Sequence, residues 1–222
     1  MWHLNDWFPV LLSLRVAFIS LILVVLLALP LARILGLYQF KGRDVLEAFF
    51  TLPLVLPPSV VGYGLLVLIG RNGILGKYLN DMGMSLIFTW WAVVLAASVV
   101  AFPLMYQSCR GAFASVDNSY EKAARTLGAN ELYIFFRVTL PLAWPGILSG
   151  VVLTFARALG EFGATLMVAG NIPGQTQTIP LAIYFAVESG DKATANTLVA
   201  IITLFCFLLI LWVNRWNRKY TH

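Results

Sequence analysis

A polar stretch divides two long apolar runs of the chain: Asp117-Asn118-Ser119-Tyr120-Glu121-Lys122-Ala123-Ala124-Arg125-Thr126-Leu127-Gly128-Ala129. Asp117 and Ser119 are both good N-cap residues, and Gly128 stands where a helix can end. The stretch therefore predicts a short helix, and residues 130–139 predict a second one that leads into Leu140-Pro141.

Small side chains would let another surface approach this helix closely, at Ala123, Ala124 and Gly128. We expect the charged side chains of Glu121, Lys122 and Arg125 to be solvated. Two interpretations remain open: a helix that docks on another protein, or an ordinary solvated connection between membrane spans.

The apolar runs on either side indicate a membrane protein. Hydrophobic residues make up 60% of the 222 residues and charged residues 11%, and the mean hydropathy is +0.84. An ordinary soluble domain has roughly 45–50% apolar and about 25% charged residues. This composition excludes a cytosolic enzyme, a secreted disulfide scaffold and a disordered linker.

We predict one all-α membrane domain, residues 1–222, with about five transmembrane helices. A spanning helix needs about 20 apolar residues, and the runs that qualify are approximately residues 14–36, 46–70, 86–108, 138–160 and 193–214. Residues 110–137 form the connecting loop that carries the polar helix. Residues 162–187 are also uncharged, but the segment 170–177 interrupts them, which predicts a loop with short helical pieces on either side.

The basic residues predict the orientation. One set of loops holds ten of them: Arg33, Lys41, Arg43, Arg110, Lys122, Arg125, Arg137, Arg215, Arg218 and Lys219. The other set holds Arg71, Lys77 and Lys192, with Arg15 at a helix end. The positive-inside rule places the first set in the cytoplasm, so we expect the N-terminus outside and the C-terminus inside. Residues 1–14 contain no Lys or Arg, which favours a retained first helix over a cleaved signal peptide.

Prolines interrupt the second span. Pro53, Pro57 and Pro58 would each remove a backbone hydrogen bond, and such breaks are tolerated where neighbouring helices or a water-filled cavity satisfy the freed groups. The segment is either a kinked packing helix or part of the lining of a pathway. Thr51 and Ser59 beside the breaks are compatible with both.

Arg157 and Glu161 are four residues apart and therefore share one face of the fourth span. Charged residues in a span are costly and are usually paired or functional. They form an ion pair that locks a gate, or Arg157 helps to steer a dianion, or both have a local packing role.

Several kinds of site have no support in the sequence. The two histidines are terminal, no His, Cys, Asp and Glu residues have metal-ligand spacing, and Cys109 and Cys206 sit in or beside apolar runs. No Gly-rich phosphate loop is present, so we expect no ATP or other cofactor on this chain. The scattered basic residues do not indicate a nucleic-acid surface.

The polar helix and its surroundings resemble the EAA loop of bacterial ABC importer permeases. Ala123-Ala124, Gly128 and Val138-Thr139-Leu140-Pro141 have the spacing of that loop, although Lys122 occupies the place of the family's glutamate and Glu121 lies one position earlier. The resemblance implies a cytoplasmic coupling helix that enters a cleft of an ATPase subunit. The coupling residues that it implies are Glu121, Ala123, Ala124, Leu127, Gly128, Leu140 and Pro141.

Three further stretches resemble the molybdate branch of this family: residues 52–63, residues 155–165, and residues 170–174 with 178–180. The resemblance implies a type I ABC importer permease fold in the cytoplasmic membrane of a bacterium or archaeon. It implies a second copy of the chain, two cytoplasmic ABC ATPase subunits that bind ATP and Mg²⁺, an external molybdate-binding protein, and lipid. Tungstate would travel with molybdate.

Sulfate permeases are close relatives of that branch and remain an alternative. A secondary transporter that needs no ATP, or a membrane anchor without a pathway, is less favoured. A secondary transporter would need intramembrane carboxylates or a repeated architecture, and Glu161 is the only acidic candidate near a span.

Overall fold

The computed structural model describes residues 7–83 and 85–218, and this part of the chain is helical with no strand. Its elements are α1 (Phe8–Leu37), α2 (Arg43–Val55), α3 (Pro58–Ile69), α4 (Ile74–Asp81), α5 (Trp90–Ala114), α6 (Asn118–Thr126), α7 (Glu131–Ile134), the π-helical turn η1 (Phe135–Thr139), α8 (Leu140–Leu159), α9 (Gly163–Ala169), α10 (Ile179–Glu188) and α11 (Lys192–Arg218).

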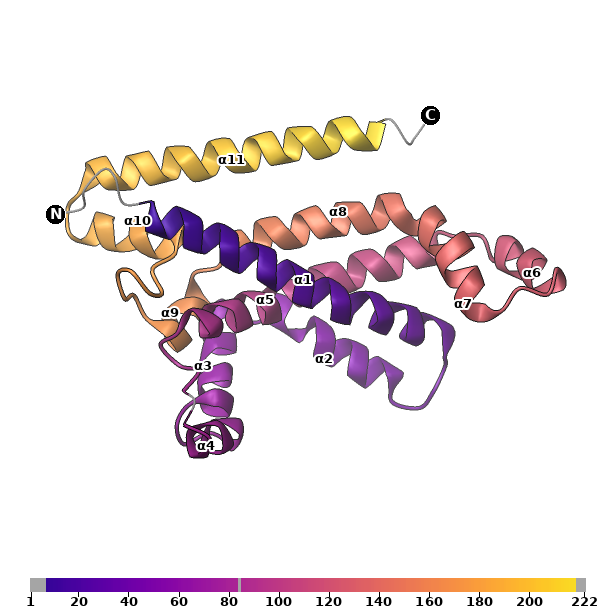
Figure 1. Cartoon of the computed structure of the whole chain (residues 1–222), viewed down its shortest axis with the longest axis horizontal. Coiled ribbons are helices and arrows are strands. Elements are labelled where there is room, and N and C mark those ends of the chain that lie inside the picture. The colour runs from indigo at the N-terminus through magenta and orange to yellow at the C-terminus, as the bar shows by residue number, and fades with distance from the viewer. Residues whose placement is uncertain (1–6, 84, 219–222) are drawn as a thin grey trace.

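Four of the helices within the described residues are long and apolar enough to cross a membrane: α1, α5, the continuous helix Glu131–Leu159, and Lys192–Trp212 within α11. They lie roughly side by side along the long axis of the molecule (Figure 1). Each differs from its predicted range: α1 begins before residue 14, α5 begins and ends later than 86–108, and the fourth helix begins well before residue 138. Hydropathy marks only the apolar section, whereas the hydrogen-bonded helix continues into polar sequence.

The second predicted span, residues 46–70, is not one helix. It consists of α2 and α3, which are bent by 117° relative to each other. The break falls at Leu56 and Pro57, which both have extended ψ angles of 143° and 136°. A residue that precedes a proline is pushed out of the helical region, and both of these residues precede one. All three prolines were expected to interrupt the span. Pro53 lies inside α2, which continues through it, whereas Pro57 and Pro58 separate the span into two helices. The four spans of the described residues become five only if this bent pair is counted as one.

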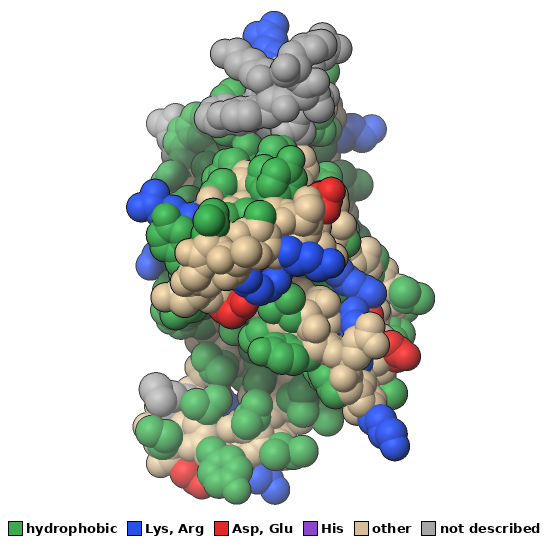
Figure 2. Space-filling model, turned by 90° about the vertical axis from the view of Figure 1, so that its right-hand side faces the viewer, with side chains coloured by type: hydrophobic (Ala, Val, Ile, Leu, Met, Phe, Trp, Pro, Cys, Tyr) green, Lys and Arg blue, Asp and Glu red, His purple; other side chains and the backbone are tan. Residues whose placement is uncertain are grey.

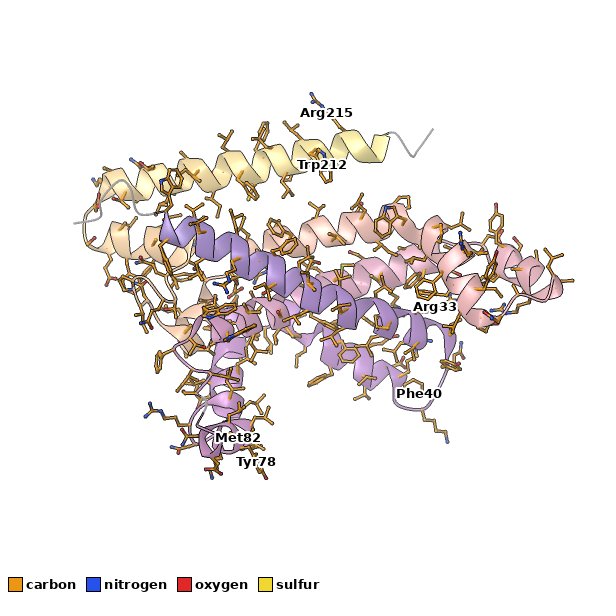
Figure 3. The ribbon with its side chains drawn as sticks, viewed as in Figure 1. Arg33, Phe40, Tyr78, Met82, Trp212 and Arg215 are labelled. Carbon is orange, nitrogen blue, oxygen red and sulfur yellow. The ribbon has the colours of Figure 1, made fainter. Side chains whose placement is uncertain are left out.

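Beyond the bend, α3 and α4 leave the bundle (Figure 1). Gly62 on α3 packs directly on α9, since a Cβ at this position would lie 2.8 Å from the Cα of Ala164. Helix α4, which the sequence did not predict, and the residue after it expose apolar side chains, including Tyr78 and Met82 at the far end of this arm (Figure 3).

Helix α5 is the centre of the packing. One buried cluster joins it to α1, α3 and α9, and a second joins it to α1 and α8. Small residues allow close approach between α5 and α8: a Cβ at Gly150 would lie 2.4 Å from the Cβ of Ser108, and one at Gly146 would lie 2.7 Å from the Cβ of Ala112. Such contacts are typical of helix packing in membranes. Cys109 is buried in the second cluster, and both Cys109 and Cys206 are free thiols.

The prediction for residues 162–187 is confirmed. Helices α9 and α10 flank an irregular segment, in which the backbone N–H of Ile172 donates to the hydroxyl of Thr176 at 3.0 Å. Helix α10 is held against α1, because the N–H of Ile179 donates to the hydroxyl of Ser13 at 2.8 Å. These short helices lie at the end of the molecule opposite α6 (Figure 1).

Candidate functional site

Helix α6 stands at one end of the molecule, beyond the ends of the long helices (Figure 1). The predicted start and end are confirmed: the Asp117 carboxylate accepts the backbone N–H of Ser119 at 2.8 Å, and Gly128 adopts φ = +83° after the last turn. Hydrogen bonds from the backbone and the side chain of Ser119 hold the pKa of Asp117 below its usual value. The positive φ favours glycine, which has no Cβ to clash.

The expectation that Glu121 is solvated is wrong. Its side chain is only 6% exposed and forms ion pairs with Arg33 of α1 at 2.9 Å and with Arg125 at 3.2 Å. The hydroxyl of Thr139 in η1 donates to the same carboxylate at 2.7 Å. The carboxylate points inward because these partners compensate for its burial, as a buried charge requires.

Burial alone would raise the pKa of Glu121. The hydrogen bond from Thr139 and the positive charge of Arg33 outweigh that effect, and the pKa lies below its ordinary value. Glu121 is therefore an anionic anchor that attaches α6 to the rest of its own chain, rather than a group on the outer surface of the helix.

Small residues and two larger apolar side chains are accessible on α6 and the turn that follows it. Leu127 is 88% exposed, Tyr120 is exposed, Ala123 is exposed and Ala124 is half-buried. Nothing lies within 4 Å of the position of a Cβ on Gly128. Figure 2 looks onto this end of the molecule, where hydrophobic side chains lie among acidic and basic ones. The four predicted residues Ala123, Ala124, Leu127 and Gly128 thus lie together on one accessible surface.

The other two predicted coupling residues lie elsewhere. Leu140 is half-buried and packs on the cluster between α1, α5 and α8, and Pro141 is in the first turn of α8. Proline suits a first turn because its missing N–H has no helical partner there. Both residues shape the start of α8, and the separate short helix predicted for residues 130–139 runs through η1 into α8 without a break.

A second ionic cluster lies between α2 and α5. The carboxylate of Glu47 forms ion pairs with Arg43 at 2.9 Å and with Arg110 at 2.5 Å. Next to it, the ring of Phe50 packs edge-on against Phe102 at 5.4 Å and Tyr106 at 5.6 Å. Since no residue of α2 is fully buried, these contacts carry much of its attachment to the bundle.

The pathway candidates fall into two places. Pro57, Pro58 and Ser59 lie at the start of α3, and Pro58 meets α9, because a Cβ on Gly163 would be 3.0 Å from the Cβ of Pro58. Thr51 lies in α2, before the bend, and its hydroxyl donates to the backbone carbonyl of Glu47 at 2.9 Å. The hydroxyl of Thr51 is therefore used within its own helix.

The predicted pair of Arg157 and Glu161 is present. The guanidinium lies 2.8 Å from the buried carboxylate of Glu161, whose other oxygen accepts the N–H of Ala164 at the start of α9. Glu161 thus ties the end of α8 to the start of α9, close to where Pro58 meets Gly163. The side chain of Arg157 remains 28% exposed.

Sequence reasoning missed Arg33 and Thr139 as functional candidates, and also the Glu47–Arg110 pair. Arg33 was counted only as a signal of orientation. Glu121 lies one position before the place of the family's glutamate, and adjacent helical residues point about 100° apart. This shift could have indicated that its carboxylate points in another direction. It shows that the carboxylate faces a different neighbour, but the sequence does not identify that neighbour.

Comparison with known proteins gives a family match over most of the chain. Residues 28–222 match the family described as "Binding-protein-dependent transport system inner membrane component". The putative molybdenum transport system permease protein YvgM of Bacillus subtilis (strain 168) is 45% identical over 215 residues, which cover 96% of this chain and 93% of that protein.

Two further relatives bear on the branch. The molybdenum transport system permease protein ModB of Escherichia coli (strain K12) is 43% identical, with 96% of this chain and 94% of that protein covered. The sulfate transport system permease protein CysT of Salmonella typhimurium (strain LT2) is 33% identical, with 94% and 75% covered. Among solved structures, the MetNI methionine ABC transporter in an inward-facing conformation matches with a TM-score of 0.76 over 100% of both chains, at 18% identity, which bears on the fold alone.

Proposed function

Because this chain belongs to the family of binding-protein-dependent transport system inner membrane components, we propose that it is the permease subunit through which an ATP-driven importer carries molybdate, and with it tungstate, into the cell. The observation that supports this most directly is identity of 43–45% to molybdenum permeases along almost their whole length. The sulfate permease is 33% identical over a smaller share of its length, so the molybdate branch is favoured over the sulfate branch.

The permease works with a separate ATPase and a binding protein on the outer side of the membrane, as members of its family do. ATP and Mg²⁺ would bind to the ATPase, and this chain itself holds no cofactor in our proposal. The exposed surface of Ala123, Ala124, Leu127 and Gly128 is suited to enter a cleft of that subunit, because its small side chains permit close approach and Leu127 offers an apolar anchor.

A second copy of the chain completes the proposed machine, with two ATPase subunits. Most oligomers are symmetric, and a pathway on a two-fold axis needs fewer helices from each copy than a pore inside one. The exposed apolar side chains of α2, α3 and α11 give ample surface for a second copy and for lipid. In the most apolar section of α11, only 11% of the residues are buried.

The proposed orientation puts α6 in the cytoplasm and the N-terminus outside. The ten basic residues counted above support it under the positive-inside rule. The arrangement of the chain is compatible, since α6 and the C-terminal end of α11 lie toward one end of the molecule and the start of α1 toward the other (Figure 1).

The transport cycle follows as a two-state equilibrium that the ligands bias. ATP binding closes the two ATPase subunits and draws the two coupling helices together, which opens the outer side of the pathway to the binding protein. Molybdate is released into the cavity, and hydrolysis restores the inward-open state. A tight anion site in the permease would oppose release, so high affinity belongs to the binding protein.

Uptake into proteoliposomes tests this function. The complex of this chain and its ATPase is reconstituted with ATP inside and the binding protein outside, and labelled molybdate is compared with labelled sulfate. We expect ATP-dependent molybdate entry that excess tungstate blocks and excess sulfate does not. Entry of sulfate instead would move the chain to the sulfate branch, and entry without ATP would support a secondary transporter.

The coupling surface is tested by Leu127→Asp. Leu127 is almost fully exposed, so the substitution leaves the packing within the chain intact, and we expect the amount of co-purified ATPase to fall about tenfold or more, as for an apolar anchor at an interface. Leu75→Asp, at an exposed position on α4 near the opposite end of the molecule, is the matched control and should retain the ATPase. Equal retention by both variants would reject this surface as the ATPase contact.

A further inference from the structure

We propose that Arg33 is a positioning residue that makes the coupling helix α6 move together with the first span α1. The inference rests on the proposed function, since it concerns how movement of the ATPase reaches the membrane helices. It assigns a role in transport to a residue outside the loop that the ATPase contacts.

The first support is the burial of the ionic contact. The guanidinium of Arg33 and the carboxylate of Glu121 are 2.9 Å apart, and their side chains are only 14% and 6% exposed. Figure 3 shows Arg33 at the end of α1 that lies nearest to α6 and α7. An exposed ion pair contributes little to stability, whereas removing one partner of a buried pair leaves an uncompensated charge and is strongly unfavourable.

The second support is the number of elements that meet at Arg33. Its guanidinium lies 6.0 Å from the ring centre of Phe113 at the end of α5 and 5.9 Å from that of Phe135 in η1. The two rings are themselves 6.0 Å apart. A cation over aromatic faces is attracted to them, so Arg33 joins α1 to α5, α6 and η1 at one point.

The third support comes from Thr139. Its side chain is fully buried, and its hydroxyl donates to the Glu121 carboxylate at 2.7 Å. Thr139 is the last residue of η1, and π-helical turns inside α-helices are frequent at functional sites. The carboxylate of Glu121 thereby contacts α1 through Arg33 and the residue before α8 through Thr139.

The other contacts of α6 with its own chain are less suited to transmit its movement to α1. Arg125 links α6 to Glu131 of α7 at 2.6 Å, but both side chains are well exposed and both elements belong to the same hairpin. Peptide connections join α6 to α5 and to α7, but none joins it to α1. The ion pair of Arg33 and Glu121 therefore gives α6 a direct link to α1, in addition to the indirect route through α5, on which α1 packs.

The test measures molybdate uptake per ATP hydrolysed in the reconstituted complex. Arg33→Gln should retain the ATPase subunit, because the outer surface of α6 is unchanged, and should still hydrolyse ATP. We expect uptake per ATP to fall about tenfold, because the buried carboxylate loses its fixed partner. Arg33→Lys, which keeps the charge, should restore part of the loss. Arg137→Gln, the same change at an exposed arginine of η1, is the control and should match the wild type.

A double-mutant cycle separates coupling from general damage to the fold. If Arg33 acts through Glu121, then Arg33→Gln combined with Glu121→Gln should reduce uptake per ATP no further than the worse single variant. Additive losses, or normal uptake per ATP in Arg33→Gln, would overturn the inference. Failure of the wild-type complex to take up molybdate with ATP would instead reject the proposed function, so the two failures are distinguishable.

Discussion

Glu47 and Arg110 join α2 to α5 by an ion pair at the end of the bundle that also carries α6. The carboxylate is nearly buried, and Arg43, one helical turn earlier, holds its other oxygen. The aromatic contacts of Phe50 lie beside this pair and complete the attachment. Helix α2 is thus fastened near its start and is separated from α3 by the bend at its end.

Arg110→Gln should loosen α2 without unfolding the chain. Arg110 is 45% exposed, so the loss in free energy of unfolding should be no more than about 1 kcal/mol. Hydrogen exchange of backbone amides in α2 should become faster, while exchange in α5 and α8 stays unchanged. Lys41→Gln, at an exposed cation before α2 that has no ion pair among the described residues, is the control. Unchanged exchange in α2 would show that the pair does not hold the helix.

Gly62→Ala should destabilise the contact between α3 and α9. The new Cβ would lie 2.8 Å from backbone and side-chain atoms of Ala164 and Met167, and overpacking of this kind costs about 1–3 kcal/mol. Gly64→Ala is a matched control in the same helix, because nothing lies within 4 Å of its new Cβ. Thermal unfolding in detergent should give a lower midpoint for Gly62→Ala only. Equal midpoints for the two variants would contradict the close approach.

Arg157→Gln should leave the buried carboxylate of Glu161 without its charged partner. The free energy of unfolding should fall by about 3–5 kcal/mol, as expected when one member of a buried pair is removed. Arg71→Gln, an exposed arginine with no ion pair among the described residues, should change it little. If Arg157→Gln lowers molybdate uptake at unchanged stability, the residue steers the anion and does not lock the joint between α8 and α9.

Acidification should weaken the attachment of α6. The pKa of Glu121 in the folded chain is lower than its ordinary value of 4.5, so its contribution to stability is fully present above that value and is lost as the pH falls through the lower folded value. The thermal unfolding midpoints of the wild type and Glu121→Gln should differ by a constant amount at neutral pH and converge below about pH 4.5. A difference that grows on acidification would reverse the sign and reject the anionic anchor.

Local signals predicted the local structure of the chain well. The cap at Asp117, the left-handed turn at Gly128 and the interrupted segment between α9 and α10 all follow from residue types within a few positions. The pair of Arg157 and Glu161 was predictable for the same reason, because four residues place two side chains on one helical face.

Features that depend on distant partners were not predictable. The prolines at 57 and 58 predicted a break, but the bend of 117° and the packing of Gly62 against Ala164 appear only in the folded chain. Likewise, the charge of Glu121 suggested solvent, and only the folded chain brings Arg33 and Thr139 to it. The sequence alone therefore does not predict which charged side chains are buried or which residues pair with them.

The departure of α3 and α4 from the bundle gives the chain unequal cross-sections at its two ends. Toward the end that carries α6, the long helices and α2 run side by side, whereas toward the other end α3, α4, α9 and α10 are added around them (Figure 1). In the proposed orientation, this wider end of the chain faces outward, toward the proposed binding protein.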